Sequence, residues 1–204
     1  MGILRGVDSE VIEPLTEAII KSGLETVEIT MNTPGASQLI AKMTKVSKQR
    51  LVVGAGTVLD LDALKKAEDS GATFIVTPVL IEEVSNYCVK HKIAIFPGAF
   101  SPLEIYKAWK LGAAMVKVFP AKFLGPAYFK EIKGSFNQVE LLACWGVTAQ
   151  NLKDYISCGA DAIAFGASIF RKEWLAKKDF AKISESIRTI LASYTDFTVK
   201  RPLA

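Results

Sequence analysis

Short β-branched runs alternate with amphipathic stretches along the whole chain, and this alternation constrains the fold more than any other feature of the sequence. Strands that alternate with helices predict an α/β domain built on a parallel sheet. The strand-like runs lie at residues 3–7, 26–31, 51–54, 73–77, 93–97, 114–120, 139–143 and 162–166. Helical spacing of apolar residues predicts helices at residues 8–22, 60–70, 81–91, 101–111 and 148–157.

Eight strand-helix units favour a closed (β/α)8 barrel, the TIM barrel, over an open doubly wound sheet. The open sheet is disfavoured because no G-x-G-x-x-G motif follows the first strand. No stretch rich in Gly, Pro or Ser divides the chain, so residues 1–204 are predicted to form a single domain. Gly23, Gly71, Gly112 and Gly159 each follow a predicted helix or precede a strand, where glycine accommodates a left-handed cap.

The composition excludes several classes of protein. Half of the residues are hydrophobic and 23% are charged, which excludes a disordered chain or a coiled coil. The net charge of +4 is not gathered in a basic block, so no nucleic-acid partner is expected. No apolar run approaches the ~20 residues of a membrane span, and the opening MGILRGVDSE is unlike a signal peptide, so no membrane partner is expected.

The cysteines and the histidine argue against a metal site. Cys88, Cys144 and Cys158 show no C-x-x-C spacing, and His91 is the only histidine in the sequence. This pattern predicts neither a disulfide framework nor a zinc site, and it favours a reducing, cytoplasmic location.

Lys117 is the first candidate catalytic residue. It lies within the apolar run Ala-Met-Val-Lys-Val-Phe-Pro at residues 114–120, where alternation places Met115, Lys117 and Phe119 on one face. In a barrel that face could be the interior, and the active site lies at the carboxyl ends of the strands. A dry setting favours the neutral amine, which attacks a carbonyl to form a Schiff base. The alternative is a lysine that extends into solvent at a sheet edge.

Glu28 is the second candidate. Thr26, Glu28 and Thr30 share one strand face, while the apolar residues between them should meet the helices. The polar face then places a carboxylate inside the barrel, where it needs a partner. Lys117 and Arg5 are the candidate partners, and a purely structural ion pair is the alternative reading.

Glycine and proline residues mark other strand ends. A Gly-Ala-Gly-Thr run at residues 54–57 follows the third strand, and Gly-Ala-Ser at residues 166–168 follows the eighth. The second run is expected to open a helix whose first amides could hold an anion, although such turns are common. Pro78 and Pro97 each end a strand and should shape the rim of the barrel.

These residues together resemble one known family. The blocks that carry the resemblance are L-R at 4–5, V-E-I-T at 27–30, V-G-A-G-T-V at 53–58, F-I-V-T-P at 74–78, F-P-G at 96–98 and V-K-V-F-P-A at 116–121. In this order and spacing, the chain resembles the 2-keto-3-deoxy-6-phosphogluconate and 4-hydroxy-2-oxoglutarate aldolases, which are class I, Schiff-base enzymes. The resemblance extends through nearly the whole chain.

The resemblance implies a homotrimer of (β/α)8 barrels that acts on a small 2-keto acid. Lys117 would form the Schiff base with the 2-keto carbon, and Glu28 would move protons at the C4 hydroxyl and at the methyl carbon of pyruvate. Arg5 would hold the substrate carboxylate, a role that other family members give to the position occupied here by Asn32. The expected substrate-binding positions are Arg5, Thr57, Pro78, Phe119, Gly146, Gly166 and Ser168. This chemistry needs no metal or organic cofactor.

The chain departs from the family pattern in two places. It reaches its first strand almost at once, so the family's helix before that strand is expected to be shortened or absent. In the seventh strand the family reads Pro-Thr-Gly-Gly, whose backbone cradles the substrate phosphate, whereas this chain has Ala143-Cys144-Trp145-Gly146. A tryptophan in place of glycine should crowd that site, which predicts a preference for an unphosphorylated substrate.

The predicted activity is cleavage of a 2-keto-4-hydroxy acid to pyruvate and an aldehyde. One alternative keeps the Schiff base but decarboxylates oxaloacetate. Another is a non-catalytic, trimeric scaffold or binding protein, whose only support is the altered seventh strand. The retained Lys117 and Glu28 argue against that last reading.

Overall fold

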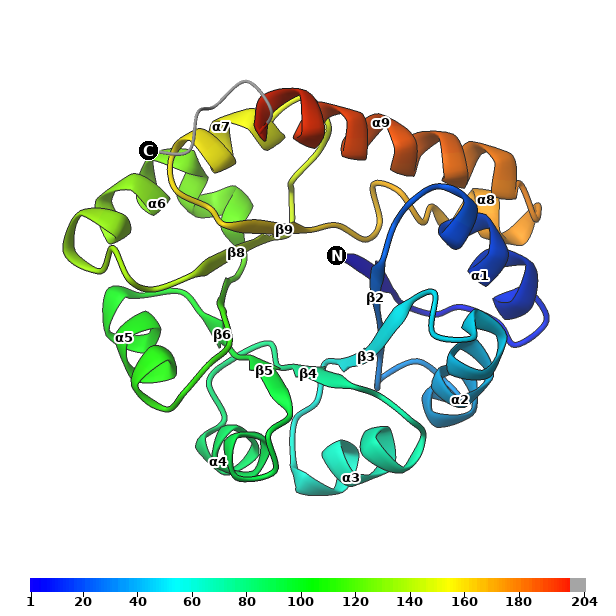
Figure 1. Cartoon of the computed structure of the whole chain (residues 1–204), viewed down its shortest axis with the longest axis horizontal. Coiled ribbons are helices and arrows are strands. Elements are labelled where there is room, and N and C mark those ends of the chain that lie inside the picture. The colour runs from blue at the N-terminus through cyan, green and yellow to red at the C-terminus, as the bar shows by residue number, and fades with distance from the viewer. Residues whose placement is uncertain (199–204) are drawn as a thin grey trace.

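A computed structural model of the chain describes residues 1–198. Figure 1 shows a ring of strands surrounded by helices, the arrangement expected of a barrel viewed along its axis. The strands are β1 (Gly2–Leu4), β2 (Thr26–Thr30), β3 (Val52–Gly56), β4 (Phe74–Val76), β5 (Ala94–Phe96), β6 (Gly98–Ala99), β7 (Val116–Val118), β8 (Leu141–Cys144) and β9 (Ala162–Ala164). The helices are α1 (Ile12–Lys21), α2 (Ala36–Ser47), α3 (Leu61–Asp69), α4 (Glu82–Lys90), α5 (Pro102–Lys110), α6 (Ala121–Ser135), α7 (Leu152–Ser157), α8 (Lys172–Ala176) and α9 (Phe180–Thr198).

Hydrogen bonds close the strands into a cylinder. Strands β1 to β5 pair in order, as do β6 to β9, and all these pairs are parallel. Between β9 and β1, the Ile3 N–H donates to the Phe165 carbonyl at 2.8 Å, and the Phe165 N–H donates to the Met1 carbonyl at 3.1 Å. The predicted (β/α)8 barrel is therefore confirmed, and the open sheet is excluded.

The fifth predicted strand, residues 93–97, continues past Pro97 instead of ending there. The strand has two halves, β5, which pairs with β4, and β6, which pairs with β7. Proline has no N–H to donate, so the ladder of strand hydrogen bonds is interrupted there. The Pro97 carbonyl still accepts a hydrogen bond from the Lys117 N–H at 2.9 Å, which keeps the two halves in one wall of the barrel.

Successive side chains of β2 point alternately to the outside and to the inside of the barrel wall. Val27 and Ile29 are fully buried in the core between the strands and the surrounding helices. Glu28 and Thr30 point the other way and are also buried. A second, smaller cluster fills the barrel itself, with Leu142, Cys144 and Ala164 at its centre and Met1, Ile3, Phe96, Met115, Phe119 and Ala162 packed against them. The predicted inward faces of the second and sixth predicted strands are therefore confirmed.

The five predicted helices are present with slightly shorter ends, and α2, α6, α8 and α9 complete the outer layer. Gly23, Gly71, Gly112 and Gly159 have φ angles of 87°, 89°, 87° and 101°, so the predicted left-handed conformations are confirmed. Within residues 1–198, no helix precedes β1, and none of the helices is long and apolar enough to span a membrane.

Asp60 caps the first turn of α3. Its carboxylate accepts a hydrogen bond from the Ala63 N–H at 2.7 Å. We expect Asp60→Ala to lower the free energy of unfolding by about 1 kcal/mol, because the N–H loses its partner. Urea denaturation measures this loss. Asp60→Asn keeps an acceptor oxygen and is the matched control, so equal destabilisation by both variants would contradict the capping role.

Candidate active site

Lys117 lies at the centre of β7, inside the barrel. Its residue is 6% exposed, and its strand is hydrogen-bonded on both sides, to β6 and to β8. The side-chain nitrogen Nζ lies 5.0 Å from the centroid of the Phe119 ring, and Phe119 follows the carboxyl end of the same strand. The reading of Lys117 as a solvated lysine at a sheet edge is therefore wrong. The structure places a primary amine within a largely apolar lumen, as the sequence predicts.

Glu28 faces the same lumen from β2. It is 1% exposed, and its Oε2 atom is buried without a hydrogen-bond partner. Burial raises the pKa of this carboxyl, an effect opposed by the positive charges of Lys117, the Met1 amine and Arg5. Within residues 1–198, neither Lys117 nor Arg5 forms an ion pair with Glu28, so the alternative reading of a structural ion pair is wrong, and both candidates act on the carboxyl only through their charge.

The unpaired carboxyl oxygen has a chemical consequence. Buried polar atoms in folded proteins almost always have a hydrogen-bond partner, and exceptions concentrate at functional sites. A carboxyl group whose pKa is raised keeps its proton to a higher pH than an ordinary carboxyl, and once ionised it is a stronger base. Glu28 therefore has the properties of a general acid and base, with one oxygen available to a hydroxyl group inside the barrel.

Gly56 provides the space that the Glu28 side chain occupies. A Cβ atom at residue 56 would lie 2.5 Å from the carboxyl carbon of Glu28, closer than atoms approach in real structures. Gly54, two residues earlier on the same face, makes room in the same way for the Phe74 ring. The sequence did not reveal these roles, although glycines two residues apart on the inward face of a strand are a signal of close approach.

Arg5 and Thr57 meet at the mouth of the barrel. The exposed Arg5 guanidinium donates to the Thr57 hydroxyl at 3.4 Å, which brings together the carboxyl ends of β1 and β3 across β2. Pro78, the next predicted binding residue, is partly buried after β4, and its carbonyl packs directly against Gly98. Arg5, Thr57 and Pro78 therefore all lie at the carboxyl end of the barrel, where the sequence predicts the site.

Trp145 and Gly146 end β8 in left-handed conformations. Their φ angles are 75° and 87°. The indole ring lies 6.3 Å from the Phe119 ring and 5.4 Å from the Phe123 ring, measured between centroids. It therefore lies towards the end of β7 and the start of α6. The Trp145 carbonyl accepts a hydrogen bond from the Lys122 N–H at 3.1 Å, which ties this loop to α6. Phe123 was not predicted as a site residue, although it follows Phe119 by four positions.

The end of β9 does not open a helix, contrary to the sequence prediction. Residues 166–168 form a turn in which the Gly166 carbonyl accepts from the Phe170 N–H at 2.8 Å, and α8 begins only at Lys172. The turn forms because Phe170 is buried and draws the chain back to the barrel. In the described part of the chain, the N–H groups of Gly146 and Ser168 donate to no protein acceptor, so backbone donors remain near this rim.

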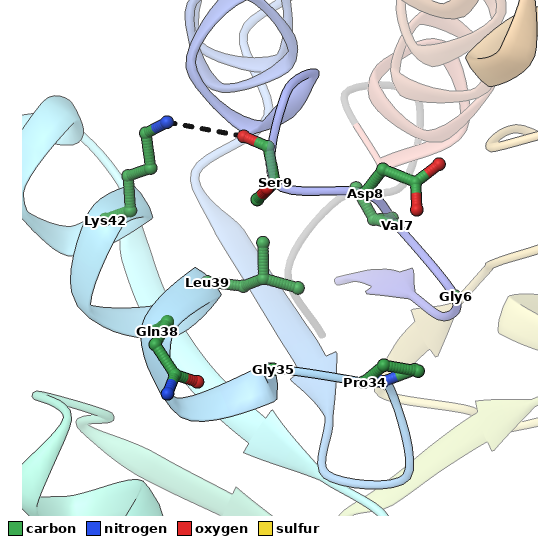
Figure 2. A pocket seen from close by; sticks show the side chains of 9 residues that line it. All are labelled: Gly6, Val7, Asp8, Ser9, Pro34, Gly35, Gln38, Leu39 and Lys42. Carbon is green, nitrogen blue, oxygen red and sulfur yellow. Dashed lines mark hydrogen bonds between the residues drawn. The ribbon is translucent and has the colours of Figure 1, made fainter.

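A cavity of about 480 Å³ lies beside the mouth, outside the lumen (Figure 2). It is bordered by the loop after β1, including Gly6 and Asp8, and by the start of α2, from which Leu39 points into it. Lys42 crosses its edge and donates to the Ser9 carbonyl at 3.3 Å. Neither Lys117 nor Glu28 lines this cavity.

The cysteine inside the barrel does not compete with Lys117 as a nucleophile, and no metal cluster is present among the described residues. Burial raises the pKa of the Cys144 thiol to about 11, so this cysteine inside the barrel stays protonated at neutral pH. Residues 1–198 hold no cluster of three or more His, Cys, Asp or Glu side chains that could bind a metal ion.

Sequence comparisons agree with this geometry. The family model described as "KDPG and KHG aldolase" matches residues 1–186. The chain is 30% identical over 172 residues to the 2-dehydro-3-deoxy-6-phosphogalactonate aldolase of Escherichia coli K12, covering 84% of each chain. It is also 30% identical over 186 residues to the 2-dehydro-3-deoxy-phosphogluconate aldolase of Pseudomonas aeruginosa, covering 91% of this chain and 84% of the relative.

Solved structures of the same family superpose closely on this one. A structure described as native KDPGal has a TM-score of 0.91 at 27% identity and covers 97% of this chain and 95% of its own. The KDPG aldolase of Legionella pneumophila, solved with pyruvate captured as a covalent carbinolamine, has a TM-score of 0.84 at 25% identity, with 92% and 90% covered. From its barrel, its lumen and these relatives, the chain belongs to the KDPG and KHG aldolase family.

Proposed function

We propose that this chain is a class I aldolase that cleaves a 2-keto-4-hydroxy acid to pyruvate and an aldehyde within one barrel domain. The observation that carries the proposal is the pair formed by Lys117 and Glu28. A buried amine and a buried, unpartnered carboxyl face one lumen without neutralising each other in an ion pair. The carbinolamine captured in the Legionella relative supports the same class of chemistry.

The first half of the reaction builds an electron sink. The Lys117 amine adds to the C2 carbonyl of the substrate and gives a carbinolamine, which loses water to become an iminium ion. Glu28, as the carboxylate, removes the proton from the C4 hydroxyl. The C3–C4 bond then breaks, its electron pair moves into the enamine, and the aldehyde leaves.

The second half restores the enzyme. The Glu28 carboxyl, now protonated, returns its proton to C3, which becomes the methyl carbon of pyruvate. Water hydrolyses the resulting iminium, releases pyruvate and frees the Lys117 amine. Arg5 lies at the mouth with Thr57 and is the candidate partner for the substrate carboxylate. Pro78 and Phe119 would line the path between Arg5 at the mouth and the Lys117 amine.

Trapping with borohydride tests the covalent step. Incubation with pyruvate and borohydride should add one reduced pyruvyl group, which peptide mass spectrometry should locate on Lys117. Lys122, five residues further on and exposed, is the nearest competitor in the sequence. A modified Lys122 with an unmodified Lys117 would overturn the assignment.

Trp145 should set the preference between phosphorylated and unphosphorylated substrates. We expect the wild-type enzyme to prefer 4-hydroxy-2-oxoglutarate over 2-keto-3-deoxy-6-phosphogluconate, because the indole occupies space where small residues would let the backbone approach a phosphate. Trp145→Gly should shift the ratio of kcat/KM values about tenfold towards the phosphorylated substrate. A wild-type enzyme with the higher kcat/KM for the phosphorylated substrate would show that phosphate binds despite the indole.

Assays with oxaloacetate separate the aldolase from a decarboxylase that uses the same Schiff base. Faster pyruvate release from oxaloacetate than from any 2-keto-4-hydroxy acid would favour the decarboxylase.

We also propose that the enzyme works as a cytoplasmic homotrimer, without nucleic-acid or membrane partners. A matched protein cage, with a TM-score of 0.91, is described as built by fusing symmetric oligomeric domains, which supports an oligomer. The free Cys88, Cys144 and Cys158 support a reducing compartment.

A further inference from the structure

Three aromatic side chains form a row from the reactive amine to the mouth of the barrel. The row begins at Phe119, whose ring centroid lies 5.0 Å from Lys117 Nζ. It continues to Trp145, 6.3 Å away, and from there to Phe123, a further 5.4 Å. The planes of neighbouring rings are inclined at 60° and 61°, an edge-to-face arrangement that aromatic pairs prefer. We call Phe119, Trp145 and Phe123 the aromatic row.

The outer members of the row remain in solvent. Trp145 is 48% exposed and Phe123 is 71% exposed. Large aromatic groups exposed side by side mark surfaces that bind a ligand or a partner. Because the inner end of the row contacts Lys117, its surface continues directly from the place where substrate would be bound covalently.

The backbone of Trp145 supports a functional reading. Its φ of 75° lies in the left-handed region, which a bulky side chain rarely adopts. The hydrogen bond from the Lys122 N–H to the Trp145 carbonyl holds the residue in this conformation. Conformations of this kind persist where the surrounding structure enforces them, and they concentrate at functional sites.

We infer that the aromatic row is the subsite for the aldehyde half of the substrate, and that it favours an apolar or aryl substituent on C4 over the carboxylate of 4-hydroxy-2-oxoglutarate. The inference rests on the proposed aldolase function. With C2 bonded to Lys117, a substituent on C4 that points to the mouth would contact Phe119 and then Trp145 and Phe123. The substrate class is a 4-hydroxy-2-oxo acid with a hydrophobic substituent at C4. The products are pyruvate and the corresponding hydrophobic aldehyde.

An apolar occupant fits this row better than a phosphate does. Aromatic rings remove water from a bound group and return no strong hydrogen bond, so they stabilise an apolar group and penalise an anion. Lys122 acts against this preference for an apolar group. Its side chain is exposed and packs against Gly146, so its positive charge could favour a phosphate. The test therefore needs a phosphorylated substrate as comparator.

Pyruvate release from two substrates tests the inference. The substrates are 4-hydroxy-2-oxo-4-phenylbutanoate, which yields benzaldehyde, and 2-keto-3-deoxy-6-phosphogluconate. Phe123→Ala should lower kcat/KM for the phenyl substrate about tenfold and change that for the phosphorylated substrate little. Phe123→Tyr keeps the ring and should retain the activity on the phenyl substrate. Tyr106→Ala removes another exposed ring, on α5, and is the matched control, with both values unchanged.

Three readouts separate the possible failures. Borohydride trapping of pyruvate on Lys117 with unchanged phenyl activity in Phe123→Ala would overturn the aromatic subsite and leave the proposed function standing. Failure of the wild type to trap pyruvate on Lys117 would overturn the proposed function and the subsite with it. Sedimentation of the wild type and of Phe123→Ala tests whether the substitution changes the oligomeric state. If Phe123→Ala loses the activity only by changing the oligomeric state, the row is a contact between copies of the chain, and the inference is wrong.

Discussion

Lys117→Met should release no pyruvate above background from any 2-keto-4-hydroxy acid. Methionine cannot add to a carbonyl, so the variant loses the iminium that accepts the electrons of the breaking C3–C4 bond. We expect kcat to fall by roughly 10⁴-fold or more, because the remaining groups cannot stabilise the carbanion alone. A coupled assay of pyruvate release measures this loss, and borohydride trapping should find no adduct.

The fold should survive this substitution. Lys117 is 6% exposed, and its Nζ faces the Phe119 ring, a setting that a flexible thioether fills well. The thermal midpoint of Lys117→Met should therefore be no lower than that of the wild type. Lys130→Met, which removes an exposed lysine from α6, is the matched control and should keep full activity. Residual cleavage in Lys117→Met that exceeds a few per cent of the wild-type rate would assign the Schiff base to another amine.

The sequence was sufficient to predict the barrel and the two groups inside it. The alternation of strands and helices predicted the parallel sheet, and the period of two in β2 and β7 placed Glu28 and Lys117 on the inward faces. These inferences succeeded because each depends on local pattern and on the rule that barrel strands end at the active site. Family resemblance then supplied roles that local pattern alone left open.

Features set by distances across the barrel were not predictable from the sequence. Alternation shows that Glu28 and Lys117 share the lumen, but it does not show whether they form an ion pair, and none is formed among the described residues. The space that Gly56 leaves for Glu28 likewise arises between neighbouring strands. The contact of Phe123 with Trp145 joins residues on α6 and after β8, which no local period brings together.

Glu28→Gln should lower turnover by roughly 10²-fold or more while the enzyme still forms the adduct with pyruvate. The amide keeps the shape of the side chain but cannot accept the proton of the C4 hydroxyl or return it to C3. Steady-state cleavage and exchange of the pyruvate methyl protons with deuterium should therefore both slow, while borohydride trapping on Lys117 persists. Glu28→Asp retains a carboxyl group on a shorter chain and should keep part of the activity. Unchanged cleavage in Glu28→Gln would refute the role.

The same variant should change how stability depends on pH. Burial raises the pKa of Glu28 in the folded protein above the unfolded value of 4.5. The folded state therefore binds more protons than the unfolded state between these two values, and the free energy of unfolding falls as the pH rises through that window. Glutamine does not ionise, so the free energy of unfolding of Glu28→Gln does not fall in this window. The variant should therefore be at least as stable as the wild type at neutral pH. Urea denaturation from pH 4.5 to 8 measures the difference. A glutamine variant that is less stable than the wild type above the window would show that the carboxylate is stabilised in the barrel, and that Glu28 is a structural partner of the nearby cations.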